Sequence, residues 1–262
     1  MPKTIDFLQN LGDAATFFVV TATLVVCALL LPWLRQRLGL SVRKEVMDGA
    51  SDAFKAVVSS LIFVLAFALY QVQANFRDAE QLVNKEANQL NTMDRLLLRY
   101  GSPEASAARS LVEQYANTEI RVEWPLLQHD GRSDEVDTLY EKLASLVRAL
   151  EPSSPRQMGQ FNDMQRSLDE MADVREARLA MTQTSLPSLY WAMITGLLVL
   201  LAILVTITHA TQDKQLSHAG LACAVGLLLS LVVIIDGPFK GQTSVGPTAI
   251  SRVLKVIQAR QF

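Results

Sequence analysis

The chain alternates between long apolar runs and one long polar segment. Four runs contain no Asp, Glu, Lys or Arg, and each has about the 20 residues that a helix needs to cross roughly 30 Å of hydrocarbon. They predict transmembrane helices over residues 14–34, 56–76, 187–209 and 215–235. The first run is longer than the apolar core of a cleavable signal peptide, and its basic residues follow it, so we expect it to remain as a membrane helix.

Between the second and third runs, residues 77–186 have the pattern of amphipathic helices. Apolar residues recur every three or four positions, and no strand-like alternation of useful length is present. Helix-breaking segments divide this insert at residues 101–103, 124–131 and 151–155. Ser102 and Ser133 are placed to cap the helices that follow them. The pattern predicts only helix and loop, arranged either as a four-helix bundle or as a stalk that continues the second and third membrane helices.

Composition agrees with a membrane protein that carries one polar domain. Half of the residues are hydrophobic and 19% are charged, while 32 of the 50 charged residues, 13 basic and 19 acidic, fall between Arg77 and Arg178. This distribution excludes a single water-soluble globule, a disordered chain and a nucleic-acid binder that relies on a basic patch. The predicted fold class is an all-α integral membrane protein with four transmembrane helices and a helical-bundle insert. Its predicted parts are the first two helices (1–76), the insert (77–186), the last two helices (187–236) and a Gly/Pro turn with an amphipathic tail (237–262).

The sequence offers little of the chemistry that enzymes use. Cys27 and Cys223 lie in apolar runs and are interpreted as small hydrophobic residues. The three histidines, His129, His209 and His218, do not have the spacing of a metal site, and Gly-rich phosphate loops and nucleophile motifs are absent. We therefore predict no catalytic residues, no metal site and no cofactor, and we do not expect an enzyme.

The second apolar run is the most polar of the four. Its polar residues are Ser59, Ser60, Tyr70, Gln71, Gln73 and Asn75. Polar groups inside hydrocarbon are tolerated where they face water or other helices. These six residues are therefore candidates for a pore-facing surface, and the alternative is ordinary polar contact between packed helices.

Three charged residues fall on the predicted seams of the insert. Glu86 occupies a seam position in its first helix, and Arg175 and Arg178 lie on or beside the seam of its last helix. Because both helices lead into the membrane, they run antiparallel, and a rise of about 1.5 Å per residue places the three charges at one level. We predict a hydrogen-bonded ion pair between Glu86 and one of the arginines, either as a structural pair or as part of a ring of charge in a vestibule.

The segment after the fourth run predicts a sharp end to that helix. Asp236 closes the apolar run and is followed by Gly237, Pro238, Phe239 and Gly241. Glycine and proline do not favour a continued helix, so we expect a turn at the membrane boundary. This turn is either a helix terminator or an acidic site that attracts cations. The amphipathic tail after it is expected to lie on the membrane or to pack on the insert.

The order of four motifs resembles that of a known family. The motifs are Asn84-Lys85-Glu86-Ala87-Asn88, Glu123-Trp124-Pro125, Pro187 before the third run, and Asp236-Gly237-Pro238-Phe239-Lys240-Gly241. Over about residues 53–254 the chain resembles the bacterial bestrophin-like family of multi-pass membrane proteins. The resemblance implies four membrane helices with a helical insert, and a distant similarity to bestrophins, which are pentameric anion channels. No acidic run suited to a bestrophin calcium clasp is present, and no cluster of aromatic and Ile residues is assigned to a bestrophin neck.

The leading functional hypothesis is a homo-oligomeric ion channel or channel-like pore. Four helices per chain are few for a pore, so several copies are needed to enclose one. The expected partners are the lipid bilayer, further copies of the chain and inorganic ions, and not nucleic acid. The alternative is a membrane-anchored sensor or scaffold whose insert binds a partner or a signal. A transporter ranks third, because no inverted repeat and no buried intramembrane charge is found.

The expected location is the bacterial plasma (inner) membrane, with two possible orientations. The connector after the first helix carries Arg35, Arg37, Arg43 and Lys44. The positive-inside rule then places this connector in the cytoplasm and the insert outside it. The resemblance to bestrophins and the basic residues of the tail favour a cytosolic insert instead. We expect the insert outside the cytoplasm, and a cytosolic insert is the alternative.

Overall fold

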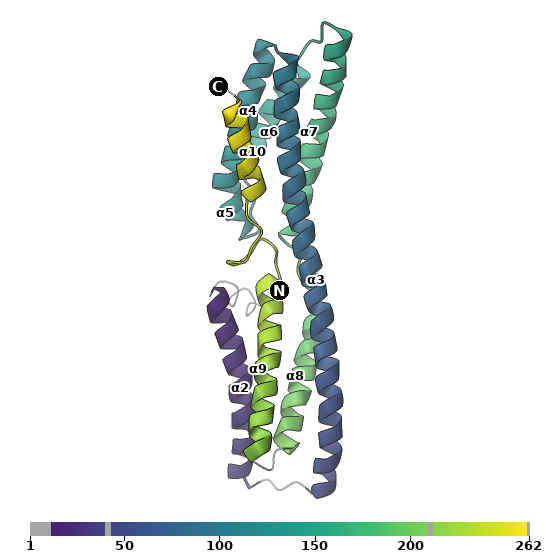
Figure 1. Ribbon diagram of the computed structural model, residues 1–262, viewed down its shortest axis with the longest axis vertical. Coiled ribbons are helices and arrows are strands. Elements are labelled where there is room, and N and C mark those ends of the chain that lie inside the picture. Colours follow the sequence, from purple (N-terminus) through teal and green to yellow (C-terminus); the bar gives the residue numbers. More distant parts are fainter. Residues whose placement is uncertain (1–11, 40–42, 209–211, 261–262) are drawn as a thin grey trace. The chain divides into compact units, whose positions relative to one another are not determined.

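The computed structural model describes residues 12–39, 43–208 and 212–260. Over these residues the chain forms helices and loops, without strands, so the predicted all-α fold class is confirmed. The helices belong to two compact units, each with its own apolar core (Figure 1). The spanning unit comprises Met1–Ala74, Ser185–Gly237 and Gly241–Thr243. The polar unit comprises Asn75–Thr184, Pro238–Lys240 and Ser244–Phe262.

The spanning unit contains the membrane helices that the apolar runs predict. Among the residues that the structure describes, four helices are long and apolar enough to cross a membrane: α2 (Asp13–Arg37), α3 (Lys44–Tyr100), α8 (Ser188–Thr208) and α9 (Gln212–Ile235). Their core joins residues such as Leu61 and Leu65 of α3 to Ile194 of α8 and Val232 of α9. The four predicted membrane helices are confirmed, although the expected end of the third at His209 lies outside the described residues.

Two contacts hold α2 against its neighbours. A Cβ atom added to Gly226 of α9 would lie only 2.8 Å from the Cα atom of Thr21, so the glycine allows the two backbones to approach closely. At the end of α2, Arg35 donates hydrogen bonds from Nη1 to the carbonyl oxygens of Thr206 and Ile207, at 2.7 and 2.8 Å. This guanidinium satisfies carbonyl groups that the end of α8 would otherwise leave unpaired.

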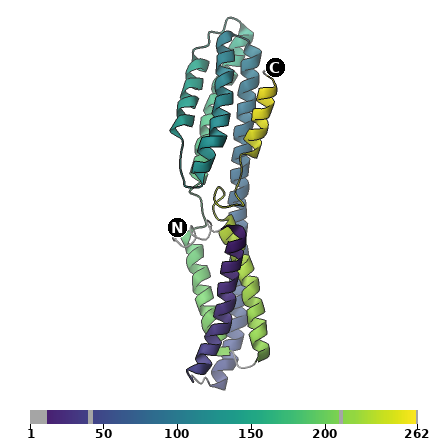
Figure 2. The same cartoon turned by 90° about the vertical axis from the view of Figure 1, so that its left-hand side faces the viewer.

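The polar unit is a helical bundle. The C-terminal part of α3 is joined by α4 (Pro103–Thr118), the π-helical turn η1 (Glu119–Glu123), α5 (Trp124–Leu127), α6 (Asp134–Arg148), α7 (Pro155–Met181) and α10 (Thr248–Ala259) (Figures 1 and 2). Of the two arrangements considered, the second membrane helix does continue into the insert as α3. The third does not, because α7 ends at Met181 and α8 begins at Ser188.

Local sequence signals explain most of the helix boundaries. The Ser102 hydroxyl accepts a hydrogen bond from the Ala105 amide (3.1 Å), and the Ser133 hydroxyl accepts one from the Val136 amide (3.4 Å), so both predicted N-caps are confirmed. The break predicted over residues 124–131 begins four residues later than expected, because the helical run continues to Leu127. Proline is tolerated in the first turn of α5, after the wider turn of η1.

The amphipathic tail packs on the insert. Ile250, Leu254 and Ile257 of α10 are buried in the core of the polar unit. Arg260 donates from Nη1 to the Asn91 and Asp94 side chains of α3, at 2.9 and 2.8 Å. Both views show α10 running beside α3 (Figures 1 and 2). Of the two positions predicted for the tail, the structure therefore shows packing on the insert.

Candidate functional site

One side of α3 in the spanning unit turns polar side chains away from the core. Leu61, Leu65 and Ala68 are buried on the opposite side, which leaves the predicted candidates near the surface. Of these, Ser59, Ser60, Tyr70 and Gln73 are exposed, whereas Gln71 and Asn75 are half-buried. The structure therefore divides the six candidates, and only four of them lie on an open surface of the protomer.

Aromatic residues that sequence analysis missed lie on the same side of α3. The rings of Phe63 and Phe67 stack edge to face with centroids 4.7 Å apart. Phe63 is 63% exposed, Phe67 50% and Tyr70 71%. The signal was a spacing of four and then three residues, which places all three rings on one face of a helix. We call Ser59, Phe63, Phe67, Tyr70 and Gln73 the aromatic–polar face.

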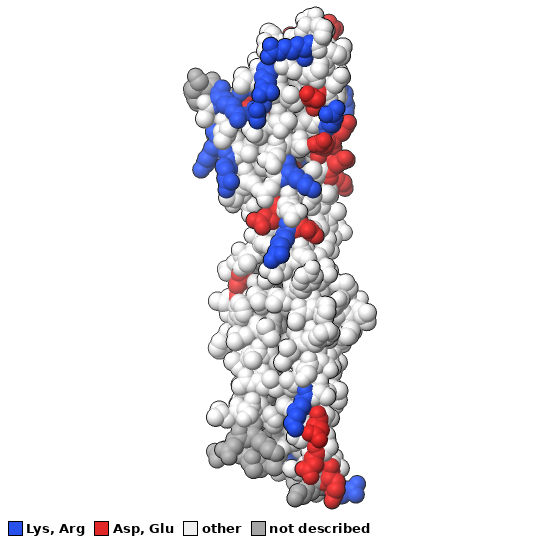
Figure 3. Space-filling view, turned by 45° about the vertical axis from the view of Figure 1, so that its right-hand side comes forward, with Lys and Arg blue, Asp and Glu red and all other residues white. Residues whose placement is uncertain are grey.

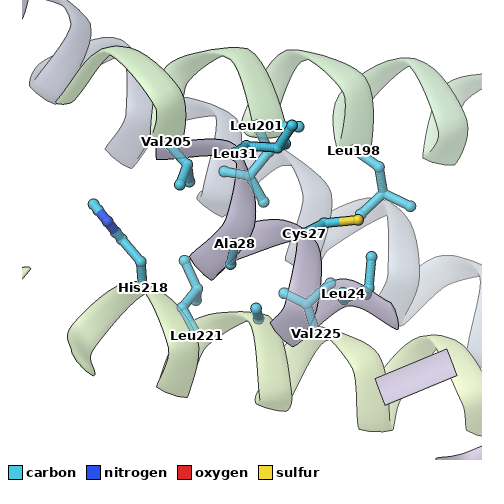
Figure 4. A pocket seen from close by; sticks show the side chains of 12 residues that line it. Leu24, Cys27, Ala28, Leu31, Leu198, Leu201, Val205, His218, Leu221 and Val225 are labelled. Carbon is cyan, nitrogen blue, oxygen red and sulfur yellow. The ribbon is translucent and has the colours of Figure 1, made fainter. Parts of the chain in front are cut away.

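The other large side chains exposed on the spanning helices are mostly apolar, and the exposed charges of this unit lie near the start of α3, at residues such as Asp52 and Lys55. Large exposed side chains include Phe18 on α2, Val199 and Ile203 on α8, and Leu227 on α9. Such side chains suit contact with lipid tails. An open pocket of about 50 Å³ between α2, α8 and α9 is lined almost entirely by aliphatic residues, with His218 at one end (Figure 4). The aromatic–polar face is therefore distinct in chemistry from the remaining lipid-facing helices.

The boundary turn after α9 is folded inward. α9 ends at Ile235, and the buried Asp236 carboxylate accepts a hydrogen bond from the Leu186 amide, with a distance of 2.6 Å from Oδ1 to N. Gly237 and Gly241 follow with positive φ angles of 111° and 78°, which glycine adopts without strain. Asp236 thus ties the end of α9 to the start of α8 rather than facing open solvent.

The rest of this turn belongs to the polar unit. Phe239 is buried against Trp124, with ring centroids 6.0 Å apart. The Pro238 carbonyl accepts a hydrogen bond from the Val245 amide (2.8 Å), and the Trp124 indole donates to the Val245 carbonyl (3.3 Å). These contacts give Trp124 and Phe239, which both occur in the family motifs, a common structural role.

Buried charges meet at the centre of the polar unit. Arg178 of α7 donates from Nε to Glu86 Oε2 (2.6 Å), and from Nη2 to Glu119 Oε1 and Glu123 Oε1 (2.7 Å each). All four of these residues are fully buried. The predicted partner of Glu86 is therefore Arg178. The other candidate, Arg175, bonds instead to Glu123 and Asp137.

The π-helical turn η1 brings two further carboxylates to this cluster. Glu119 and Glu123 stand at its two ends and both point into the core. The Trp124 ring follows directly and stacks on the Arg178 guanidinium, whose Cζ atom lies 5.0 Å from the ring centroid. Sequence analysis missed Glu119 and Glu123. Their spacing of four residues before Trp124-Pro125 was the available signal.

Burial and charge together set the protonation of the cluster. Burial, and next the Glu86 carboxylate, raise the pKa of Glu119 well above its usual value. Burial also acts to raise the pKa of Glu123, but hydrogen bonds from Arg175 and the charge of Arg178 outweigh it, so this pKa is lowered. The three buried carboxylates of Glu86, Glu119 and Glu123 and the guanidiniums of Arg175 and Arg178 are joined by ion pairs. We call these five residues the buried charge cluster.

The chain matches the model of one protein family over most of its length. The model of the bestrophin-like domain matches residues 22–250. The chain belongs to the bestrophin-like family. This confirms the resemblance seen in the sequence motifs. A search of curated proteins gave no match.

Solved structures share the fold of this family member. A bacterial bestrophin homologue from Klebsiella pneumoniae is 14% identical, with a TM-score of 0.63 over 94% of this chain and 98% of that one. A variant of that homologue is 12% identical, with a TM-score of 0.69 over 95% and 98% of the two chains. A crystal structure described only as a membrane protein has a TM-score of 0.67 at 12% identity, over 93% and 97%. At these identities the likeness establishes the fold.

Proposed function

We propose that this chain forms a homo-oligomeric ion channel whose pore within the membrane is lined by the aromatic–polar face of α3. The observation that carries the proposal is that aromatic and polar side chains share one exposed face of α3, whereas the large side chains exposed on α2, α8 and α9 are mostly aliphatic or otherwise apolar. The Ser59 hydroxyl donates to the Lys55 carbonyl (3.0 Å), but the glutamine and tyrosine of this face lose hydrogen bonds to water when they face lipid tails, and they regain them when they line an aqueous path. The bestrophin fold supports the same conclusion.

Assembly is part of this proposal. The described part of a protomer has four candidate spans, and one face of α3 cannot enclose a pore alone. In a closed ring of identical copies, each copy presents the same face to the axis. Phe63, Phe67 and Tyr70 then form successive rings of aromatic side chains, and narrow apolar rings of this kind can gate ion flow by excluding water.

The exposed side of α3 in the polar unit adds charge to the ion pathway. Its exposed basic residues recur at helical spacing and are Arg77, Lys85, Arg95 and Arg99, and they outnumber the two exposed acids of this stretch, Asp78 and Glu80. A pathway lined by positive charge raises the local concentration of anions. We therefore assign anions as the preferred permeant ions.

The pore is tested by cysteine accessibility in planar bilayers. Starting from a Cys27→Ser/Cys223→Ser chain, single cysteines replace Ser59, Phe63 or Tyr70, with Val199→Cys and Ile203→Cys on α8 as exposed controls. A water-soluble thiol reagent should reduce the current of the α3 variants and leave the α8 controls unchanged. Equal modification of both helices would refute the proposal that the aromatic–polar face of α3 lines the pore. Absence of current across several salts would favour the sensor or scaffold instead.

For localisation we propose the plasma membrane of a bacterial cell. The basic connector after α2 favours an insert outside the cytoplasm. Membership of the bestrophin-like family favours a cytosolic one. A reporter that is active on one side only, fused after Phe262, distinguishes the two, because α10, shortly before the fusion point, belongs to the polar unit.

A further inference from the structure

The polar unit presents opposite charges on two of its sides. α10 packs against α3 and α4, while α6 and α7 contact each other on the other side of the bundle. In the space-filling view, Lys and Arg gather mostly on one side of this unit and Asp and Glu mostly on the other (Figure 3). Faces that differ in this way suit a head-to-tail contact between copies rather than a contact of one face with itself.

The basic side is formed by the exposed surface of α10. Ile250, Leu254 and Ile257 point into the core, so Arg252 and Lys255 lie on the opposite side of the helix and are exposed. Neither residue has an ion-pair partner among the described residues of the protomer. We call these two residues the basic flank. Their charges are available to another molecule.

The acidic side contains a cleft of about 390 Å³ between α6 and α7, whose lining carries four carboxylates, of Asp137, Glu141, Asp173 and Glu176, and two guanidiniums, of Arg132 and Arg175. Both guanidiniums are already paired with carboxylates of the same chain, so the cleft keeps an excess of acid. Glu141 and Asp173 line it, are exposed, and form no ion pair within the described part of the chain. Tyr140 lies between these elements, and its pKa is raised by burial and by the neighbouring Asp169 carboxylate. We call this the acidic cleft. Carboxylates beside an aromatic ring suit a guanidinium or ammonium group.

The two sides stand at similar heights along α3. Arg252 shares a cleft with Glu80 and Asn84 of α3. On the other side, Asp173 lies between Ser167, which bonds to Gln89 at 3.0 Å, and Arg178, which bonds to Glu86. The heights of Arg252 and Asp173 along α3 therefore differ by no more than about two helical turns, or roughly 10 Å, and long basic side chains largely span that distance. Rotation about an axis parallel to α3 therefore brings the two sides together with little rise, as a closed ring requires.

We propose that the acidic cleft of one copy receives the basic flank of the next copy, so that these charges join the subunits of the ring. This inference rests on the proposed homo-oligomeric channel and identifies the surfaces that assemble it. Arg252 and Lys255 pair with Glu141 and Asp173 of the neighbouring copy. The contact is heterologous, and α3 stays free to face the axis.

A charge swap tests the contact. The first variant is Arg252→Glu/Lys255→Glu, the second is Glu141→Lys/Asp173→Lys, and the third combines all four changes in one chain. Mass measurement of the full chain in nanodiscs gives the oligomer fraction at several concentrations. Either reversal should weaken assembly by about tenfold or more, because like charges then face each other. The combined variant should restore assembly, which a folding defect would not do.

Glu151→Lys/Asp163→Lys is the matched control, since both residues are exposed acids outside the cleft. It should assemble like the unmodified chain. If both reversals assemble normally, the docking surfaces are wrong while the oligomer stands. If the unmodified chain is monomeric at every concentration, the docking proposal also fails. Assembly that follows the charge swap in a chain that carries no current would count against the channel and for this interface.

Discussion

At the scale of single residues, Arg178 holds the buried charge cluster together, because its guanidinium bonds to Glu86, Glu119 and Glu123 at once. A charged residue on an apolar seam must find partners, which was enough to predict the ion pair of Glu86 from the sequence. The antiparallel arrangement of α3 and α7 places Arg178 at the same height as Glu86. Glu119 was not predictable in the same way, because it enters the core through the π-helical turn, and a helix of regular pitch gives no sign of that turn.

Replacing Arg178 by methionine should strongly destabilise the polar unit. Three fully buried carboxylates share this guanidinium, and removing one partner of a buried charge network leaves the others without compensation. We expect Arg178→Met to lower the free energy of unfolding by about 3–5 kcal/mol, measured by denaturant titration in detergent. Arg166→Met is the control, because the Arg166 side chain is 71% exposed, and it should change stability by less than about 0.5 kcal/mol.

Glu119→Gln should remove part of the pH dependence of stability. The pKa of Glu119 is raised, so the folded state keeps a proton that the unfolded chain releases above its usual pKa of 4.5. The free energy of unfolding therefore falls as pH rises from 4.5 toward the raised pKa, by at most about 1.4 kcal/mol per pH unit. Glutamine has no such proton to lose. Unfolding series at several pH values should show a flatter profile for the variant, and parallel profiles would contradict the assignment.

At the scale of elements, periodicity and capping were sufficient to place most helices. Uncharged runs predicted the membrane spans, and Ser102 and Ser133 marked two helix starts. The aromatic–polar face was harder to recognise. Phe63 and Phe67 fit a buried seam as well as an exposed face, and only the packing of Leu61, Leu65 and Ala68 on the opposite side distinguishes the two.

The packing of α2 on α9 gives a prediction at this scale. Gly226→Ala places a methyl group 2.8 Å from the Thr21 Cα atom, so the helices must separate, at a cost of about 1–3 kcal/mol. Gly220→Ala on the same helix is a matched control, because no atom lies within 4 Å of its added Cβ. Thermal unfolding in detergent should show a lower midpoint for the first variant and an unchanged or higher one for the second, since alanine favours helix. Equal midpoints would argue against close α2–α9 packing.

At the scale of the whole molecule, the sequence supports the fold better than the function. Apolar length and helical spacing determine four spans and a polar insert, and each of the two units closes its own core. A pore depends on surfaces that meet only between copies, and a pattern within one chain does not show which exposed face meets which. The exposed side chains of the protomer show which faces are available for such contacts. Polar and charged faces that the fold leaves open need either a partner or water.

Ion selectivity tests the assembled molecule. If the exposed side of α3 in the polar unit lines the ion path, Arg95→Glu replaces a ring of positive charge by a negative one, and every copy contributes the change. We expect the ratio of anion to cation permeability, measured from reversal potentials in salt gradients, to fall by about twofold or more. Lys142→Glu on α6 makes the same change of charge on another exposed surface and should leave the ratio unchanged. A similar shift in both variants would point to a general effect of net charge, and a shift in neither would remove α3 of the polar unit from the ion path.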